Sequence, residues 1–199
     1  RIDFSNDAKG ALLLEPTRSN LVTYSNEFTN SYWNVNSNAL RSLSSNLSPD
    51  GGLNAYKIEA VSNTQVGSLG TTTIGTIITH SLYVRRISGS TNFNMVDVNN
   101  VSTSFNITDE WQRFSVTATA TSTNLRNYFR LNAVGDVVEV YAFQAEQGSY
   151  ATSYIPNFGN SAGATRSADV SSQTVPSGII GQTEGTVFLD VDFKTLSGT

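Results

Sequence analysis

Alternation of apolar and polar side chains with a period of two is the feature that most constrains this chain. In the window 74–87, Leu82 and Val84 fall on one face, whereas Tyr83 and Arg85 fall on the other. Successive side chains of a β-strand point to opposite faces, so such a window predicts a strand with one buried face. Three further windows follow the same rule: residues 111–119, 125–133 and 137–144.

Clusters of Gly, Asn, Asp, Ser and similar residues separate these windows, at residues 88–91, 122–124 and 133–136. The run Pro49-Asp50-Gly51-Gly52 is typical of a turn, because Pro presets φ and Gly accepts a positive φ. No segment longer than about ten residues shows a period of 3.6. The pattern therefore predicts an all-β protein, an antiparallel two-sheet β-sandwich.

The alternation also predicts which side chains form the core. We expect five apolar residues to lie between the sheets: Leu82, Val84, Phe114, Val116 and Val140.

Charge and composition exclude several classes of function. The 199 residues carry 12 basic and 16 acidic side chains, for a net charge of −4. Such a surface repels phosphate backbones, so nucleic acid is not an expected partner. Without cysteine, neither disulfides nor a thiolate metal site can form. No apolar run approaches the roughly 20 residues of a membrane span, so membrane insertion is not expected.

Residues suited to catalysis are few. His80 is the only histidine and stands at the entry of a predicted strand, where we expect a capping or surface role. A Ser-His-Asp triad would depend on it alone. Glu139 and Glu146 share a neighbourhood, but nothing marks them as the carboxyl pair of a glycosidase. The sequence therefore predicts that the protein is not an enzyme.

Two motifs near opposite ends of the chain carry a family resemblance. The first is GALLLEPTRSNL at residues 10–21, followed by YSNEF at 24–28 and by Trp33. The second is QAEQGSYATSYIP at residues 144–156, followed by TRSAD at 165–169. Together they resemble the opening and closing signatures of a jelly-roll module of phage tail-fibre and receptor-binding proteins and related surface proteins. The resemblance implies a carbohydrate-binding-like module at residues 1–168, located on a virion surface or outside cells.

The rest of the chain differs in character. Gly, Ser and Asn dominate residues 156–182, which we interpret as a closing loop that continues into a linker at 169–184. The segment 185–193 then alternates like a strand that lacks partners. In the family resembled, such a segment opens a laminin-G or concanavalin-like sandwich. We therefore expect residues 185–199 to be the truncated first strand of a following domain; the alternative, that this strand completes the first sandwich, stays open.

A second resemblance suggests binding residues. The run SLYVRRISGS at residues 81–90 resembles the groove strand of xylan- and glucan-binding jelly-roll modules, in which an aromatic side chain faces the groove. Carried over, that residue is Tyr83, and Arg85 shares its face. In the same comparison Tyr128 matches a groove aromatic, whereas Arg130 stands where the family carries an acid.

The strand before the closing motif adds Tyr141, with Glu139 and Phe143 expected on the same face. Aromatic rings pack on sugar rings, while amides and charged groups bond hydroxyls. For each tyrosine, the alternative is a half-buried structural ring. We expect a polysaccharide or cell-surface glycan to bind residues from neighbouring strands: Tyr83, Arg85, Tyr128, Arg130, Glu139 and Tyr141.

Other residues of the motifs are expected to support the scaffold. Trp33 and Trp111 match scaffold positions, and Arg18 and Arg166 are expected to pin the opening and closing segments. No cofactor is predicted. Related modules often hold a structural calcium ion near the opening and closing motifs, but residues 144–146 offer only one carboxylate here. The alternative, a weak calcium site completed by backbone carbonyls, stays open.

These observations predict a non-catalytic carbohydrate-binding module that adheres to polysaccharide, from a phage tail fibre or a similar multidomain surface protein. A trimeric parent fibre would make it part of a homotrimer. Two alternatives stay open: a structural spacer that positions a neighbouring lectin-like domain, and an accessory module of a polysaccharide-degrading enzyme.

Overall fold

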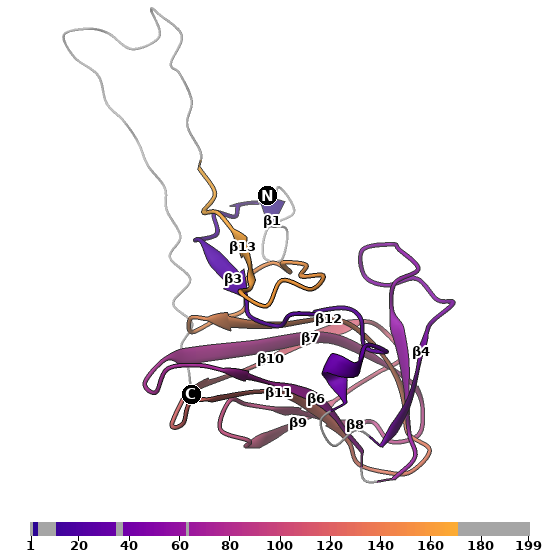
Figure 1. Ribbon diagram of the computed structural model, residues 1–199. Helices are drawn as coiled ribbons and strands as arrows, with labels where there is room; N and C mark the ends of the chain where they lie inside the picture. Colours follow the sequence, from indigo (N-terminus) through magenta and orange to yellow (C-terminus); the bar gives the residue numbers. More distant parts are fainter. Residues whose placement is uncertain (1, 4–10, 35–37, 63, 171–199) are drawn as a thin grey trace, which may run out of the picture. The chain divides into compact units, whose positions relative to one another are not determined.

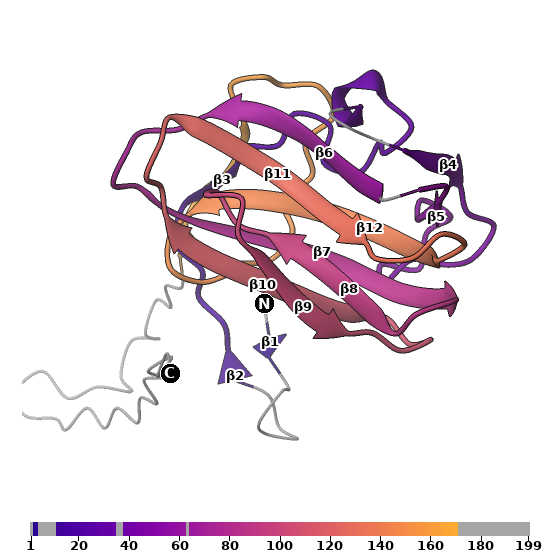
Figure 2. The same cartoon turned by 90° about the horizontal axis from the view of Figure 1, so that it is seen from below.

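Two antiparallel β-sheets stacked face to face form most of the part of the chain that the structure describes (Figures 1 and 2). The structure is a computed structural model and describes residues 2–3, 11–34, 38–62 and 64–170. The five-stranded sheet has the order β10-β7-β12-β5-β4, and the four-stranded sheet the order β6-β11-β8-β9.

The strands of the five-stranded sheet are β4 (Ala39–Leu43), β5 (Tyr56–Ala60), β7 (Ile77–Ser88), β10 (Gln112–Thr119) and β12 (Val137–Gln147). Those of the four-stranded sheet are β6 (Thr64–Thr71), β8 (Asn92–Val96), β9 (Ser102–Asn106) and β11 (Asn124–Leu131). Two short pairs complete the structure: β1 (Ile2–Asp3) with β2 (Ala11–Leu12), and β3 (Arg18–Asn20) with β13 (Ala164–Arg166).

The order of the strands identifies the topology. From β5 to β12, successive strands alternate between the two sheets, except that β8 and β9 form a hairpin within one of them. The resulting orders, β5-β12-β7-β10 and β6-β11-β8-β9, nest two Greek keys as in an eight-stranded jelly roll. The predicted all-β jelly-roll sandwich is therefore confirmed. Within the described residues, the one helical element is the short 3-10 turn η1 (Ser31–Trp33), and no helix could cross a membrane.

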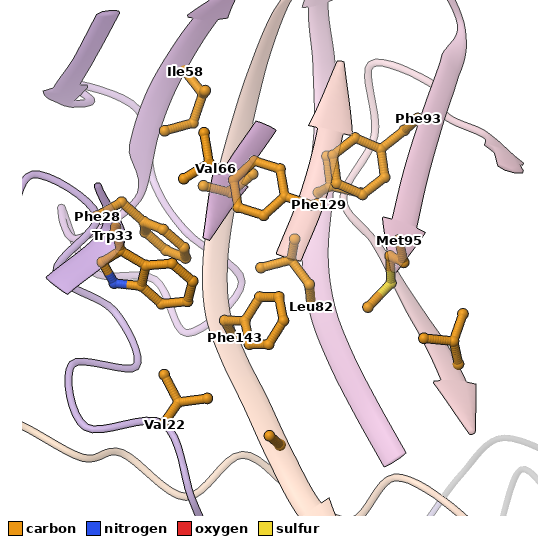
Figure 3. Close-up of a cluster of buried hydrophobic side chains, with 14 of the residues drawn as sticks. Val22, Phe28, Trp33, Ile58, Val66, Leu82, Phe93, Met95, Phe129 and Phe143 are labelled. Carbon is orange, nitrogen blue, oxygen red and sulfur yellow. The ribbon is translucent and has the colours of Figure 1, made fainter. Parts of the chain in front are cut away.

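The core lies between the sheets and follows the predicted alternation. Four of the five expected core residues are buried, and Phe114 is partly buried against the same cluster. Figure 3 shows aromatic rings from both sheets meeting there. Trp33 is fully buried, with its ring centroid 4.8 Å from that of Phe28 and 5.3 Å from that of Phe143. The prediction that Trp33 packs within the scaffold is confirmed.

The expectation that His80 caps a strand or lies on the surface is wrong. β7 begins at Ile77, so His80 lies inside the strand on the same inward face as Ile78 and Leu82. Its side chain is fully buried, with the ring centroid 5.8 Å from that of Phe143. Burial disfavours the charged imidazolium and lowers the pKa of His80 to about 4.

A bulge in β12 corrects a second expectation. The pairing of β12 with β7 shifts register between Tyr141 and Gln144, and Ala142 has a φ of 59°. The extra residue reverses the alternation, so Phe143 points into the core, whereas Tyr141 faces outward. The prediction that Phe143 shares a face with Tyr141 is therefore wrong.

The opening and closing motifs hold one another. Arg166 forms an ion pair with Glu15 at 2.7 Å, and Arg18 approaches Glu146 at 3.6 Å. Asn20 is fully buried and donates to the carbonyl of Ile155 at 2.9 Å. The expectation that the two arginines pin these segments is confirmed. The predicted strand at 185–199 and all but the first two residues of the predicted linker lie outside the described residues, so the domain boundaries stay a prediction.

Candidate functional site

Four of the six predicted binding residues meet on the outer face of the five-stranded sheet. Tyr83 and Arg85 of β7 lie directly opposite Tyr141 and Glu139 of β12. The two tyrosine rings are 6.0 Å apart between centroids. The guanidinium of Arg85 contacts the Glu139 carboxylate with Nη2 at 2.6 Å and Nε at 2.7 Å. The strand pattern and the register of β7 with β12 together bring these side chains into one group.

The other two predicted binding residues, Tyr128 and Arg130, do not lie on this face. Both belong to β11, which pairs with β6 and β8 in the four-stranded sheet. Phe129 between them points into the core, so they share the outer face of the opposite sheet. The expectation that they join Tyr83 from a neighbouring strand is wrong, because a jelly roll sends successive strands to alternate sheets.

The loop between β4 and β5, residues 44–55, folds over the outer face (Figure 1). Ser44 and Asn46 both donate to Oε1 of Glu139, the latter at 2.7 Å. Glu139 is only 2% exposed, and burial would raise the pKa of this carboxyl. The donors from the loop and from Arg85 outweigh burial and hold the pKa below its ordinary value. The Arg85–Glu139 pair is thus a structural anchor for the loop.

The same loop brings Asp50 to Tyr141. The Tyr141 hydroxyl donates to Oδ2 of Asp50 at 2.7 Å, and Asn54 donates to the same oxygen at 3.1 Å. The other carboxylate oxygen accepts from the Ser48 hydroxyl and from the backbone N–H of Gly52. The bond from Ser48 lowers the pKa of Asp50 most, and the remaining donors, against the opposing effect of burial, bring it well below its ordinary value.

A pocket of about 340 Å³ opens beside this contact. Three separate stretches of the chain, together with Tyr141, form its wall: residues 26–27, residues 50–56 and residues 154–158. The side chains are four aromatic rings, two carboxylates, two amides and one proline, namely Tyr56, Tyr141, Tyr154, Phe158, Glu27, Asp50, Asn26, Asn54 and Pro156. Such a mixture of ring faces and hydrogen-bonding groups suits a small polar ligand with an apolar face.

A row of rings connects this pocket with the rest of the outer face. The guanidinium of Arg113 lies 5.2 Å from the centroid of the Tyr83 ring. Tyr83 is followed by Tyr141 and then by Tyr154, whose ring centroid is 5.6 Å from that of Tyr141. Phe158 lines the same pocket as Tyr141 and Tyr154 and has 71% of its surface exposed. The row offers a ligand contacts from β10 across β7 and β12 to the pocket.

Trp111 borders the same face. Its ring lies 5.0 Å from the Arg85 guanidinium, and its indole N–H donates to the carbonyl of Leu47 at 3.0 Å. It lies outside the buried core cluster and links the β4–β5 loop to the start of β10. The expectation that Trp111 packs at an edge of the scaffold fits these contacts.

Several lining residues were not predicted as binding residues. Asp50 belongs to a run interpreted only as a turn, and Asn54 follows that run without having been singled out. Glu27 and Tyr154 belong to the opening and closing motifs. Among the lining residues that were not predicted, only Phe158 stands out in the sequence, because it is a large aromatic residue within a Gly- and Asn-rich segment. The others become recognisable only when the chain brings the three stretches together.

The carboxylate considered for calcium is engaged by the protein itself. Glu146 is fully buried, accepts from the Thr152 backbone N–H at 2.8 Å and from the Thr152 hydroxyl at 2.7 Å, and faces Arg18. Gln144 also donates to it at 2.7 Å. Within the described residues, no group of three or more His, Cys, Asp or Glu side chains is placed to hold a metal ion.

Comparison with known proteins finds similarity in fold but not in sequence family. No protein-family model matches the sequence, and neither does any curated protein. Among solved structures, a family 16 carbohydrate-binding module is similar with a TM-score of 0.47 and 13% identity, covering 63% of this chain and 99% of that chain. A structure described as "CBM4 structure and function" reaches 0.43 with 16% identity, over 57% of this chain and 81% of that one.

A third similar structure is the CBM22-1 xylan-binding domain of Paenibacillus barcinonensis Xyn10C. Its TM-score is 0.43 at 13% identity, over 71% of this chain and 98% of that chain. The structural neighbours are thus carbohydrate-binding modules. Similarity at this level decides nothing about what this chain binds, which has to be argued from its own side chains.

Proposed function

We propose that this protein is a non-catalytic carbohydrate-binding module, and that the outer face of the five-stranded sheet is its binding face. The observation that carries the proposal is the row of Tyr83, Tyr141 and Tyr154 that leads into the pocket beside Asp50. Ring faces pack on the C–H surfaces of a pyranose, and carboxylates and amides accept or donate to its hydroxyls.

The exposure of Phe158 supports the same proposal. A phenylalanine with 71% of its surface in water gains little from burial, yet this one lines a pocket together with three tyrosines. Exposed aromatic residues beside a pocket are typical anchors of binding sites.

The ionised carboxylate of Asp50 favours a non-catalytic role. A glycosidase needs one protonated carboxyl to donate to the leaving oxygen, and that group usually has a raised pKa. The donors around Asp50 lower its pKa instead, so this carboxyl stays ionised at neutral pH.

We further propose adhesion as the biological role, on a phage tail fibre or a similar multidomain surface protein, in a virion or extracellular setting. The support is the resemblance of the opening motif at residues 10–28 and the closing motif at residues 144–169 to those of phage tail-fibre and related surface modules. Weak binding at one site would gain avidity if the parent protein were a trimer. A structural spacer and an accessory module of a polysaccharide-degrading enzyme are the competing roles.

Titration calorimetry or affinity electrophoresis against β-glucans, xylans, mannans and algal polysaccharides tests the proposal. We expect at least one glycan to bind, and Phe158→Ala to weaken that binding about tenfold, the loss of roughly 1.4 kcal/mol. Val134→Ala is the matched control, because Val134 is equally exposed at 71% but does not line this pocket.

Three outcomes separate the roles. If no glycan binds at millimolar site concentration, the spacer role replaces the binding role. If Phe158→Ala binds like the parent, the binding face has been assigned wrongly. Release of reducing sugar by the purified protein would overturn the non-catalytic part alone.

A further inference from the structure

The pocket beside Asp50 combines negative charge with aromatic rings, and its lining contains no positive side chain among the residues that the structure describes. Its nine lining residues include two carboxylates and four aromatic rings, but no Lys, Arg or His. Two cations of the same sheet face are paired with carboxylates outside the pocket, Arg85 with Glu139 at 2.6 Å and Lys57 with Glu59 at 3.5 Å. The charge of the pocket is therefore not neutralised by these cations.

Glu27 supplies a free carboxylate. It is half-buried in the pocket wall, and its side chain makes no hydrogen bond or ion pair within the described residues. A partly buried carboxylate without a partner is unfavourable, because it has lost part of its water without gaining a donor. A ligand with a positively charged donor would satisfy it.

Asp50 supplies a second charge that is fixed in place. Its carboxylate accepts from Tyr141, Asn54, Ser48 and the backbone of Gly52, and every one of these donors is neutral. Neutral donors stabilise the ionised form without cancelling its charge. Both oxygens of the Asp50 carboxylate thus accept hydrogen bonds from the protein, but the carboxylate still gives the pocket a negative charge at neutral pH.

The rings complete a surface suited to a cation. An ammonium group within about 6 Å of an aromatic face is attracted by the ring quadrupole. Tyr154 and Tyr141 are protonated at physiological pH, as any ordinary tyrosine is, and burial raises the pKa of each further, that of Tyr154 to about 12. Together with Tyr56 and Phe158 they line the same pocket as the two carboxylates.

We propose that this pocket selects a sugar residue that carries a protonated amino group, such as a glucosamine unit, over neutral and acidic sugars. The proposal rests on the carbohydrate-binding function and adds the chemical class of the ligand. A volume of about 340 Å³ is at the small end of ligand sites, which suits a short segment of a chain. A uronate or a sulfated sugar would be repelled by both carboxylates.

Calorimetry at about pH 6, where amines are protonated, provides the test. The ligands are a glucosamine tetramer, its N-acetylated counterpart, which has the same backbone without charge, and a galacturonate tetramer. We expect the glucosamine tetramer to bind about ten times more tightly than the N-acetylated one and the galacturonate not to bind. Raising the salt from about 0.05 M to about 0.5 M should weaken only the charged ligand.

Glu27→Gln locates the effect, because this change removes a charge without breaking a contact. It should reduce the affinity for the glucosamine tetramer about fivefold and leave the N-acetylated tetramer within about twofold. Glu110→Gln is the matched control: Glu110 is exposed and is not part of the pocket, so its variant should behave like the parent.

The outcomes distinguish this proposal from the function on which it rests. Equal affinity for the two tetramers, or tighter binding of the N-acetylated one, overturns the charge selection while leaving carbohydrate binding intact. Failure of these and all neutral glycans to bind overturns both. A preference that survives both Glu27→Gln and Asp50→Asn overturns the assignment to this pocket.

Discussion

Tyr141 and Asp50, which are 91 positions apart in the chain, are joined by a hydrogen bond of 2.7 Å from the phenol to the carboxylate. The bond ties the β4–β5 loop to the middle of the five-stranded sheet. It also sets one wall of the pocket, so the stability of the loop and the shape of the candidate site depend on the same contact.

Tyr141→Phe should therefore loosen the loop. We expect a loss of about 1 kcal/mol in the free energy of unfolding, at the low end for a bond to a charged group, because Asp50 is exposed to solvent. Chemical denaturation measures this. Tyr83→Phe is the control, since the Tyr83 hydroxyl makes no hydrogen bond within the described residues, and it should unfold like the parent. Equal stability of the two variants would contradict the role given to the contact.

Tyr83→Ala should weaken glycan binding about tenfold, because the ring row loses the stacking surface at its β7 end, worth roughly 1 to 2 kcal/mol. Its stability should change less, since Tyr83 is half-buried and lies outside the core cluster. Calorimetry with the best ligand of the glycan panel gives the affinity, and thermal melting gives the stability. Unchanged affinity would restrict the site to the pocket and exclude the strand β7.

Acid should destabilise the protein through His80. The pKa of this side chain is about 4 in the folded state against 6.5 for the free group, so between these values the unfolded chain binds more protons. Stability should fall as pH drops from about 6.5 to about 4, by on the order of 3 kcal/mol at roughly 1.4 kcal/mol per pKa unit. Asp50 and Glu139 have lowered pKa values, so their contributions are lost only at lower pH, below about 4.

Two measurements check the origin of that loss. His80 is the only histidine, so its ring resonances can be followed by NMR without assignment ambiguity. They should remain those of a neutral ring down to about pH 5. His80→Gln, which cannot titrate, should flatten the pH dependence of stability in the same range. A His80 that titrates near pH 6.5 in the folded protein would contradict its placement in the core.

Substitutions at Ala142, in the bulge of β12, should change stability according to how well each residue tolerates a positive φ. The φ of 59° at Ala142 is unfavourable for a residue with a Cβ and worse for a β-branched one. Ala142→Gly should leave stability within about 1 kcal/mol of the parent or raise it, while Ala142→Val should lower it by about 2 kcal/mol or more. Ala142→Val should also weaken glycan binding by displacing Tyr141. A valine variant as stable as the parent would show that β12 can pair without the bulge.

The alternating pattern was enough to predict the class of fold and most of the core. Leu82, Val84 and Val140 are buried where the pattern placed them, because the two-residue period of a strand is a local property that neighbouring side chains reveal. The pairing of Tyr83 with Tyr141 was within reach for the same reason, since both lie on outward positions of adjacent strands.

Tertiary structure decided the rest. Tyr128 has the same kind of outward position as Tyr83, but the sheet that β11 joins depends on pairing between strands far apart in sequence, which no local pattern encodes. The bulge at Ala142 reversed the facing of Phe143, and the stacking of the two sheets buried His80, which shares the inward face of β7 with Leu82. The pocket itself arises only when residues near 27, 50 and 154 meet, because each contributes a side chain that, taken alone, looks like part of a turn or a scaffold motif.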